Sequence, residues 1–188
     1  MSAATIDDVR RARRVVCFGA SGSGKSTVAT ALGERLGLPV THLDDVCWDP
    51  GWVEVPAEEQ RRRALPIVRS DEWVLDALRS AIAADAWPHV DVIIGLDYPR
   101  AVSLARLVRR TWRRIRTREL VCNGNVETLR LALAKDSVIV WHFRSWRSKR
   151  ERMRAWHADA SAPPVLLLSR PADADRLLRD LRGSTSRG

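Results

Sequence analysis

Residues 14–36 of the chain read RVVCFGASGSGKSTVATALGERL, and this stretch decides the fold. Its centre, residues 19–26 (GASGSGKS), matches the phosphate-binding pattern G-x-x-x-x-G-K-[ST] without a mismatch. The apolar run before it, residues 15–18, predicts a short buried strand, and apolar residues at helical spacing after Ser26 predict a helix. Strand, glycine-rich loop and helix in this order are the context in which the pattern binds phosphate. The sequence therefore predicts a nucleoside triphosphate site.

The residue types of this loop fit the chemistry of a triphosphate. Glycines let the backbone turn tightly, so that successive amide N–H groups point at phosphate oxygens. The start of the following helix adds its positive end, which favours a bound anion. Lys25 can reach the β- and γ-phosphates, and the Ser26 hydroxyl suits Mg²⁺. We expect the contacts to ATP to come from Gly19, Gly22, Ser23, Gly24, Lys25, Ser26 and Thr27.

Composition favours one globular domain over the whole chain. With 188 residues, 45% of them hydrophobic, the chain can bury one substantial core but not two. No apolar run approaches the ~20 residues that span a bilayer, so we expect no membrane partner. Three widely spaced cysteines and an N-terminus unlike a signal peptide favour a reducing, cytoplasmic location. The expected domain has its core at residues 14–182 and a disordered tail at 183–188.

Positive charge is concentrated in one part of the chain. Residues 100–154 hold 16 Lys and Arg but only 4 Asp and Glu, a net charge of +12. The whole chain carries +9, so the remaining residues carry −3. A basic zone this dense implies a polyanionic partner, which is either nucleotide phosphates or nucleic acid.

Strand and helix signals alternate along the chain. Alternation with continuous apolar strands predicts an α/β fold, in which helices cover both faces of a five-stranded parallel sheet to give three layers. The expected strands are residues 15–18, 40–43, 73–75, 90–96 and 165–168. The expected helices are residues 24–36, 57–69, 101–116, roughly 126–135, 138–157 and 172–181.

Aspartates recur just after the expected strands. Asp44 and Asp45 follow the second strand, Asp76 follows the third, and Asp97 ends the fourth. In a parallel sheet these positions gather at one edge, where carboxylates can hold Mg²⁺ or deprotonate a hydroxyl. Each aspartate could instead be a helix N-cap or a loop residue, and this interpretation suits Asp97 best. We favour function for Asp44, as the candidate base, and for Asp76.

Several segments resemble a known family. Residues 96–100 (LDYPR) followed by Arg106 and Arg110 in R-x-x-x-R resemble the fourth strand and lid entry of adenylate kinases and related small kinases. Residues 36–44 (LGLPVTHLD), the Trp48 and Trp52 pair, and residues 73–76 (WVLD) resemble one branch more closely. That branch is the adenylate-kinase-like proteins often labelled DNA topology modulation proteins. The resemblance covers roughly residues 14–118 and returns faintly at 165–170.

The resemblance implies a P-loop nucleoside/nucleotide-kinase-like fold with ATP and Mg²⁺ as cofactors. It implies Mg²⁺ near Ser26 with Asp76, and stabilisation of transition-state charge by Arg106 and Arg110. These two arginines would belong to a helical, Arg-rich lid at residues 106–125. The spacing of the arginines independently places them on one helical face, where guanidinium groups suit phosphate oxygens.

The chain departs from this family on the acceptor side. Residues 77–79 (ALR) follow Asp76, where the branch usually has Gly-Asn-Tyr. The acceptor region is expected at residues 46–70, between the second and third strands. Trp48 and Trp52 either stack on a planar or sugar-like acceptor or cap the core.

A second basic block, residues 141–150 (WHFRSWRSKR), interleaves aromatic and cationic side chains. This composition is typical of a nucleic-acid surface. It is also what a helix needs to bury Trp141, Trp146 and Met153 while it exposes its arginines. We favour the second interpretation, so that nucleic acid is an alternative partner and not the preferred one.

The sequence thus favours an ATP-dependent phosphotransferase that acts on a small acceptor. A hydroxyl acceptor fits the expected base Asp44, or Asp45 beside it, because a hydroxyl has a proton to lose. A nucleotide acceptor would instead favour added arginines. Two other classes remain: an ATP-binding, nucleic-acid-associated protein, and a regulatory module that binds nucleotide without transferring phosphoryl groups. The sequence carries no signal for an oligomeric state.

Overall fold

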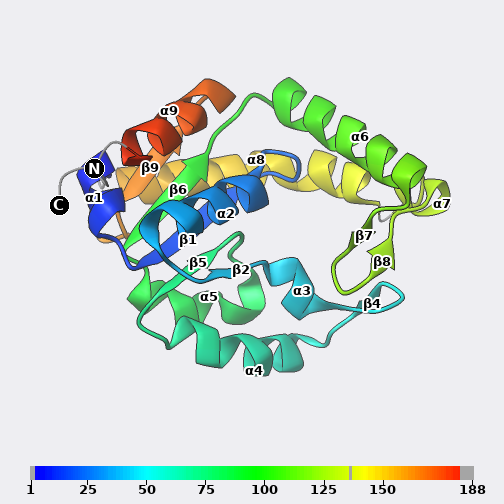
Figure 1. Ribbon diagram of the computed structural model, residues 1–188, viewed down its shortest axis with the longest axis horizontal. Coiled ribbons are helices and arrows are strands. Elements are labelled where there is room, and N and C mark those ends of the chain that lie inside the picture. The colour runs from blue at the N-terminus through cyan, green and yellow to red at the C-terminus, as the bar shows by residue number, and fades with distance from the viewer. Residues whose placement is uncertain (1–2, 136, 183–188) are drawn as a thin grey trace.

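The computed structural model describes residues 3–135 and 137–182. Its centre is a sheet of five parallel strands in the order β2-β5-β1-β6-β9 (Figure 1). This arrangement confirms the predicted α/β fold with a five-stranded parallel sheet. The tail predicted at residues 183–188 lies outside the described residues. The strands are β1 (Arg14–Gly19), β2 (Val40–Thr41), β5 (Trp73–Leu75), β6 (Val92–Leu96) and β9 (Val165–Leu168).

The central strand β1 is buried on both faces, as its continuous apolar run predicts. Val15, Val16 and Cys17 have no exposed surface. Val15 pairs with Val74 of β5 on one side and with Val92 of β6 on the other. The carboxyl end of β1 therefore lies between the carboxyl ends of β5 and β6, where ligands bind in such sheets.

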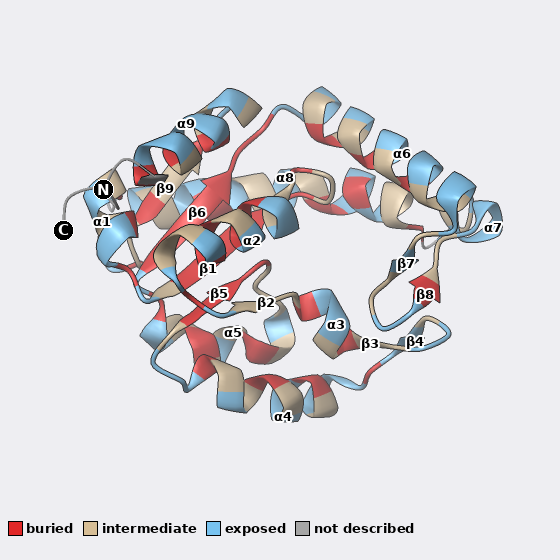
Figure 2. Ribbon diagram, in the orientation of Figure 1, coloured by how far each residue is buried: buried red, intermediate tan, exposed pale blue. Residues whose placement is uncertain are grey.

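Helices cover both faces of the sheet and complete three layers. One core cluster joins β1 to α1, α2 and α9, and the other joins β1 to α4, α5 and α8. Figure 2 shows buried residues along the central strands and on the helix faces that turn toward them. The covering helices are α1 (Ile6–Arg11), α2 (Lys25–Leu36), α4 (Ala57–Val68), α5 (Ser80–Ala86), α8 (Val138–Ala158) and α9 (Pro171–Arg182).

Two of these helices were not predicted from the sequence. Thr5 is the N-cap of α1: its hydroxyl accepts from the Asp8 amide while the Asp8 carboxylate accepts from the Thr5 amide. This capping box fixes a segment for which no helix was expected above. α5 is only 7 residues long, and the 3₁₀ turn Trp87–His89 follows it directly. A helix this short gives too few turns for a periodic pattern to stand out.

The predicted lid differs in its second half. α6 (Arg100–Thr117) matches the expected helix, but a hairpin of β7 (Leu120–Val121) and β8 (Asn125–Val126) follows it. Cys122, Asn123 and Gly124 form the turn with positive φ angles. An Asn-Gly pair is a strong hairpin signal, and it overrides the helix predicted at residues 126–135. Only α7 (Leu129–Ala132) is helical within that range.

The segment after β2 also differs from the prediction. β2 ends at Thr41, and α3 (Leu43–Cys47) begins where we expected the strand to continue. A second hairpin, β3 (Trp48–Asp49) and β4 (Val53–Glu54), follows α3. Asp44 and Asp45 therefore lie in the first turn of a short helix and not at a strand end. Within the described part of the chain, no helix is long and apolar enough to cross a membrane.

Candidate functional site

The glycine-rich loop leaves β1 at Gly19 and enters α2 at Lys25. Gly22 and Gly24 have φ angles of 78° and 95°, which L side chains rarely adopt. A Cβ on Gly22 would also collide with the Ser103 carbonyl and lie 2.7 Å from the Leu107 Cβ. Glycine at position 22 therefore lets the loop turn and lets α6 pack directly on it.

Lys25 lies folded over this loop. Its Nζ donates a hydrogen bond to the Ala20 carbonyl at 3.0 Å, and its side chain is half-buried. Burial lowers the pKa of the ammonium, while the Asp76 and Asp44 carboxylates act in the opposite direction. The cation is thus held at the mouth of the loop with two carboxylates in electrostatic reach.

Asp76, directly after β5, is the centre of a compact hydrogen-bond network. The Ser26 hydroxyl donates to its Oδ2 at 2.6 Å, and the Leu43 amide donates to its Oδ1 at 2.9 Å. The Nδ1 atom of His42 lies 3.0 Å from the same Oδ2. Asp76 is only 4% exposed, so this network fixes its carboxylate beside the loop. The sequence did not single out His42. Its ring reaches the site only because His42 directly precedes α3.

The Ser26 and Asp76 pair provides the oxygen ligands that Mg²⁺ prefers. Mg²⁺ in nucleotide sites takes one or two carboxylates together with substrate phosphates and water, and needs no cage made of protein alone. Among the described residues, no group of three or more His, Cys, Asp or Glu side chains could hold a metal ion. Ser26 and Asp76 therefore fit a Mg²⁺ ion that binds together with the nucleotide.

Two arginines of α6, which the sequence assigned to a lid, lie near the loop or act on it. The Nη1 of Arg106 donates to the Ser23 carbonyl at 3.4 Å. Arg110, one turn further on, is half-buried; burial and then Arg114 lower its pKa. In the described part of the chain its Nε has no hydrogen-bond partner. Arg109 is exposed, whereas Arg106 and Arg110 share the helical face that turns toward the rest of the protein.

Asp44 lies on the other side of the loop, in the first turn of α3. Its side chain is 59% exposed, and its Oδ1 lies 3.6 Å from the Arg79 guanidinium. Arg79 also lies 3.8 Å from Glu54, so neither carboxylate binds it tightly. Burial raises the pKa of the neighbouring Asp45. Asp44 is the member of the pair that acts electrostatically on Lys25.

Lys149 of α8 also lies near these charged residues, although the sequence did not single it out. Burial lowers the pKa of this half-buried lysine to about 8. Lys25 and Arg79 act on it in the same direction, and Asp44 acts against them. These contributions place its ammonium in electrostatic range of the loop and of α3. Lys149 comes near the loop because α8 packs over the loop, and the sequence carries no signal for this packing.

Solved structures with the same architecture place the chain among known folds. Shikimate kinase from Acinetobacter baumannii in complex with shikimate aligns with a TM-score of 0.56 and 16% identity, over 98% of this chain and 100% of that chain. A gluconokinase from Sinorhizobium meliloti 1021 aligns with a TM-score of 0.51 and 16% identity, over 93% and 91%. The fold is that of the P-loop small-molecule kinases. No family model and no curated protein sequence matches the chain.

Within this P-loop kinase fold, Asp97 takes no part in the candidate site. Its carboxylate is buried and binds the Arg150 Nε at 2.6 Å and the Arg154 Nη2 at 2.8 Å. Both arginines come from α8. The ion pairs join the end of β6 to α8. The sequence favoured a helix N-cap or a loop residue, but the N-cap of α6 is Pro99, and Asp97 instead forms buried ion pairs.

Of the residues that we expected α8 to bury, Trp141 is exposed and Trp146 is only half-buried. Trp141 and Phe143 are 54% and 49% exposed, whereas His142 between them is fully buried. The His142 Nδ1 donates to the Ser21 carbonyl of the P-loop at 3.0 Å. Met153 is buried as expected. The prediction was wrong for Trp141 because α8 packs on the loop through its histidine face, a contact that sequence alone does not reveal.

Trp48 and Trp52 join the two hairpins of this P-loop kinase fold. Their rings meet edge to face at 5.9 Å, and the Trp52 indole N–H donates to the Val126 carbonyl at 3.0 Å. Asn123 donates to the backbone of both Asp45 and Trp48, which fixes the hairpin of β7 and β8 on α3 and β3. The sequence left the two tryptophans between acceptor stacking and core capping, and in the structure they lie between the two hairpins.

Proposed function

We propose that the protein is an ATP-dependent phosphotransferase that transfers the γ-phosphoryl group of ATP to a hydroxyl of a small acceptor. The observation that carries this proposal is the 2.6 Å contact between Ser26 and Asp76, beside Lys25 at the mouth of the P-loop. A hydroxyl, a carboxylate and an ammonium in this arrangement are what a triphosphate with its metal requires. The P-loop kinase fold supports the proposal.

On the nucleotide side, loop amides and Lys25 would bind the phosphate oxygens. Ser26 and Asp76 would hold Mg²⁺, which when bound neutralises charge on the phosphates. Arg106 already contacts the loop, and Arg110 has a buried, unpartnered Nε within the described structure. A guanidinium with free donors suits the charge that develops on a transferring phosphoryl group.

On the acceptor side, Asp44 would accept the proton of the attacking hydroxyl. Its exposed carboxylate lies in electrostatic range of Lys25, hence on the γ-phosphate side of the loop. Arg79 and Lys149 lie around it and favour an acceptor that carries negative charge. A base beside the loop supports a hydroxyl acceptor over a nucleotide phosphate, which has no such proton to lose.

Several basic residues form ion pairs within the chain, and this weakens the nucleic-acid alternative. Five arginines of the basic zone are engaged in ion pairs with carboxylates of the same chain, so less charge remains for a phosphate backbone. The exposed Trp141 and Phe143 rings lie under Lys149 and Arg100, at 5.9 Å and 4.3 Å. The closer resemblance to DNA topology modulation proteins stays a prediction, as do the cytoplasmic location and the single domain over residues 1–188.

The decisive experiment is an ATP-consumption screen over nucleosides, nucleotides, sugars and hydroxy acids, with Lys25→Ala as the matched inactive control. We expect turnover that depends on one acceptor class and falls well over tenfold in Lys25→Ala, with an unchanged circular dichroism spectrum. ATP binding without acceptor-dependent turnover would favour the regulatory module instead. Tight polynucleotide binding with a log–log salt slope of several units, and no such turnover, would favour the nucleic-acid protein.

A further inference from the structure

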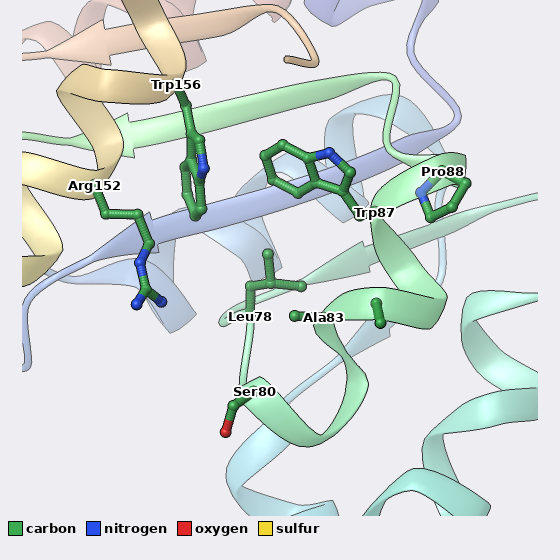
Figure 3. A pocket seen from close by; sticks show the side chains of 8 residues that line it. Leu78, Ser80, Ala83, Trp87, Pro88, Arg152 and Trp156 are labelled. Atoms are coloured by element: carbon green, nitrogen blue, oxygen red, sulfur yellow. The ribbon is translucent and has the colours of Figure 1, made fainter. Parts of the chain in front are cut away.

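A pocket of about 340 Å³ lies between α5 and α8, outside the residues assigned above to ATP. Figure 3 shows the Trp87 and Trp156 rings side by side along one wall of it, with Leu78 below them and Arg152 of α8 beside Trp156. Its volume is at the lower end of the range for small-molecule sites, about 300–1,000 Å³. The lining residues are Leu78, Ser80, Ala83, Ala84, Trp87, Pro88, Arg152 and Trp156.

The walls of this pocket are apolar and held in place. The Trp87 and Trp156 rings lie 5.0 Å apart, and Trp156 also packs edge to face on Phe18 at 4.8 Å. Phe18 belongs to β1 and is buried. Ala83 and Ala84 present only methyl groups toward the space, which leaves it hollow. Rigid aromatic walls with small residues opposite suit a flat apolar group.

Two helices lead from the candidate acceptor side into the pocket. Arg79, which faces Asp44, is the N-cap of α5, and the pocket residues of that helix follow it. On α8, Lys149 is followed by Arg152 and Trp156 at spacings of three and four, which places all three on one helical face. The pocket therefore continues the acceptor side and is not a separate hollow elsewhere on the surface.

Positive charge lies where the pocket joins the acceptor side. Arg152 is exposed and, in the part of the chain that the structure describes, has no ion-pair partner. Its neighbours on α8 differ in this respect, because Arg147, Arg150 and Arg154 all bind carboxylates. Lys149 lies close enough to Arg152 for the two cations to repel each other. An anionic group placed between them would relieve this repulsion.

We propose that the acceptor is an anionic alcohol with an apolar ring: the hydroxyl faces Asp44, the anion lies between Lys149 and Arg152, and the ring occupies the pocket. This inference rests on the proposed phosphotransferase function. It extends that function from the reaction to the chemistry of the acceptor. A compound without the ring leaves the tryptophan-lined space unfilled, and a compound without the anion leaves the two cations unpaired.

The test is direct binding by titration calorimetry, which needs no phosphoryl transfer. The ring-bearing probes are 3-phenyllactate and 2-hydroxy-4-phenylbutyrate, and the matched probe without a ring is lactate. Burial of a phenyl group predicts that at least one ring-bearing probe binds about 10–100-fold more tightly than lactate. Ala83→Leu fills the pocket and should remove this preference, whereas Ala172→Leu on the exposed surface of α9 should retain it.

The contribution of the anion is tested with Arg152→Gln against Arg144→Gln, an exposed arginine of α8 that does not line the pocket. Arg152→Gln should weaken binding of the ring-bearing probes about tenfold, and Arg144→Gln should leave their binding unchanged.

Ala84→Leu, at an exposed position, repeats the pocket-filling test in case Ala83→Leu does not fold. Equal binding of all three probes, or a ring preference that survives both filling variants, overturns the proposal.

The outcomes also separate this inference from the proposed function. A ring preference that Ala83→Leu removes, in a protein without acceptor-dependent ATP turnover, supports the pocket and contradicts the kinase. Turnover on an acceptor without a ring, combined with equal binding of the three probes, supports the kinase and contradicts the pocket.

Discussion

Two buried aspartates end the strands on either side of β1, and they have opposite surroundings. Asp76 ends the β5 side and is 4% exposed, while Asp97 ends the β6 side and is 6% exposed. Asp76 accepts hydrogen bonds from a hydroxyl and a backbone amide, and the His42 ring lies beside it. Asp97 is bound by two guanidinium groups.

The difference shows how equal sheet positions lead to different roles. The charge of Asp97 is neutralised by Arg150 and Arg154, so it joins β6 to α8 and has nothing left for a ligand. Asp76 has no Lys or Arg in direct contact within the described residues, and its negative charge acts on Lys25 across the loop. A buried carboxylate that accepts hydrogen bonds only from neutral donors is suited to bind a cation that enters with a ligand. The partner of each aspartate, and not its burial or strand, decides its role.

The largest effect on turnover is expected at Asp44. Its exposed carboxylate lies in α3 and not at either of the two strand ends compared above. If Asp44 takes the proton of the acceptor hydroxyl, Asp44→Asn should lower kcat by about 10²–10⁴ while ATP affinity stays nearly constant. Steady-state kinetics with the acceptor from the screen, together with ATP titration, measure both. Loss of ATP and Mg²⁺ binding would move Asp44 to metal coordination, and unchanged kcat would shift the role of base to Asp45.

Asp76→Asn tests the ligand side of the comparison. The amide oxygen can still accept from Leu43, but the NH₂ group that replaces Oδ2 cannot accept from Ser26, and the negative charge beside Lys25 is lost. We expect turnover to fall by about 10²–10³ and the Mg²⁺ concentration for half-maximal turnover to rise. Magnesium titrations of ATP turnover give both values. A variant within threefold of the parent protein would show that Asp76 is structural like Asp97.

Lys149 should make acceptor binding depend on pH. Burial lowers its pKa to about 8, with Lys25, Arg79 and Arg152 adding to the lowering and Asp44 opposing it. The lysine is charged below this pH and neutral above it, so KM for an anionic acceptor should rise about tenfold as the pH increases through 8. Lys149→Arg stays charged and should abolish the dependence. A KM that rises equally in both proteins would assign the titration to another group.

The smallest effect on turnover is expected at Asp97. Asp97→Asn leaves Arg150 and Arg154 without their carboxylate, and should lower the free energy of unfolding by about 1–3 kcal/mol. The cost is below that of a fully buried pair because the two guanidinium-bearing side chains are 33% and 55% exposed. Urea denaturation measures it, and turnover of the folded fraction should stay within twofold. A large loss of turnover without loss of stability would erase the contrast with Asp76.

The nucleotide side of the molecule could be predicted because its signals are local. Residues 19–26 specify a loop by consecutive residue types, and the strand that leads into it follows from a continuous apolar run. Even the approach of Ser26 to Asp76, 50 residues apart in sequence, follows from the rule that parallel strands end at one edge. The acceptor chemistry and the roles of these residues stay predictions.

The acceptor side could not be predicted because it depends on contacts between distant elements. Lys149 acts near Lys25 only because α8 lies over the loop through His142. The hairpin of β7 and β8 is fixed by Asn123, whose side chain reaches the backbone of Asp45 and Trp48. Neither contact leaves a periodic pattern in the sequence. The Asn-Gly turn at residues 123–124 was a readable signal for the hairpin, and the helical pattern around it concealed that signal.

The close contact at Gly22 ties α6 to the loop. Because the Ser103 carbonyl and Leu107 lie directly against Gly22, the first two turns of α6 and the loop form one packed unit. Arg106 belongs to this unit, and its Nη1 contacts the Ser23 carbonyl. A side chain at position 22 would therefore displace Arg106 together with α6, and the loop would lose its arginine as well as its shape.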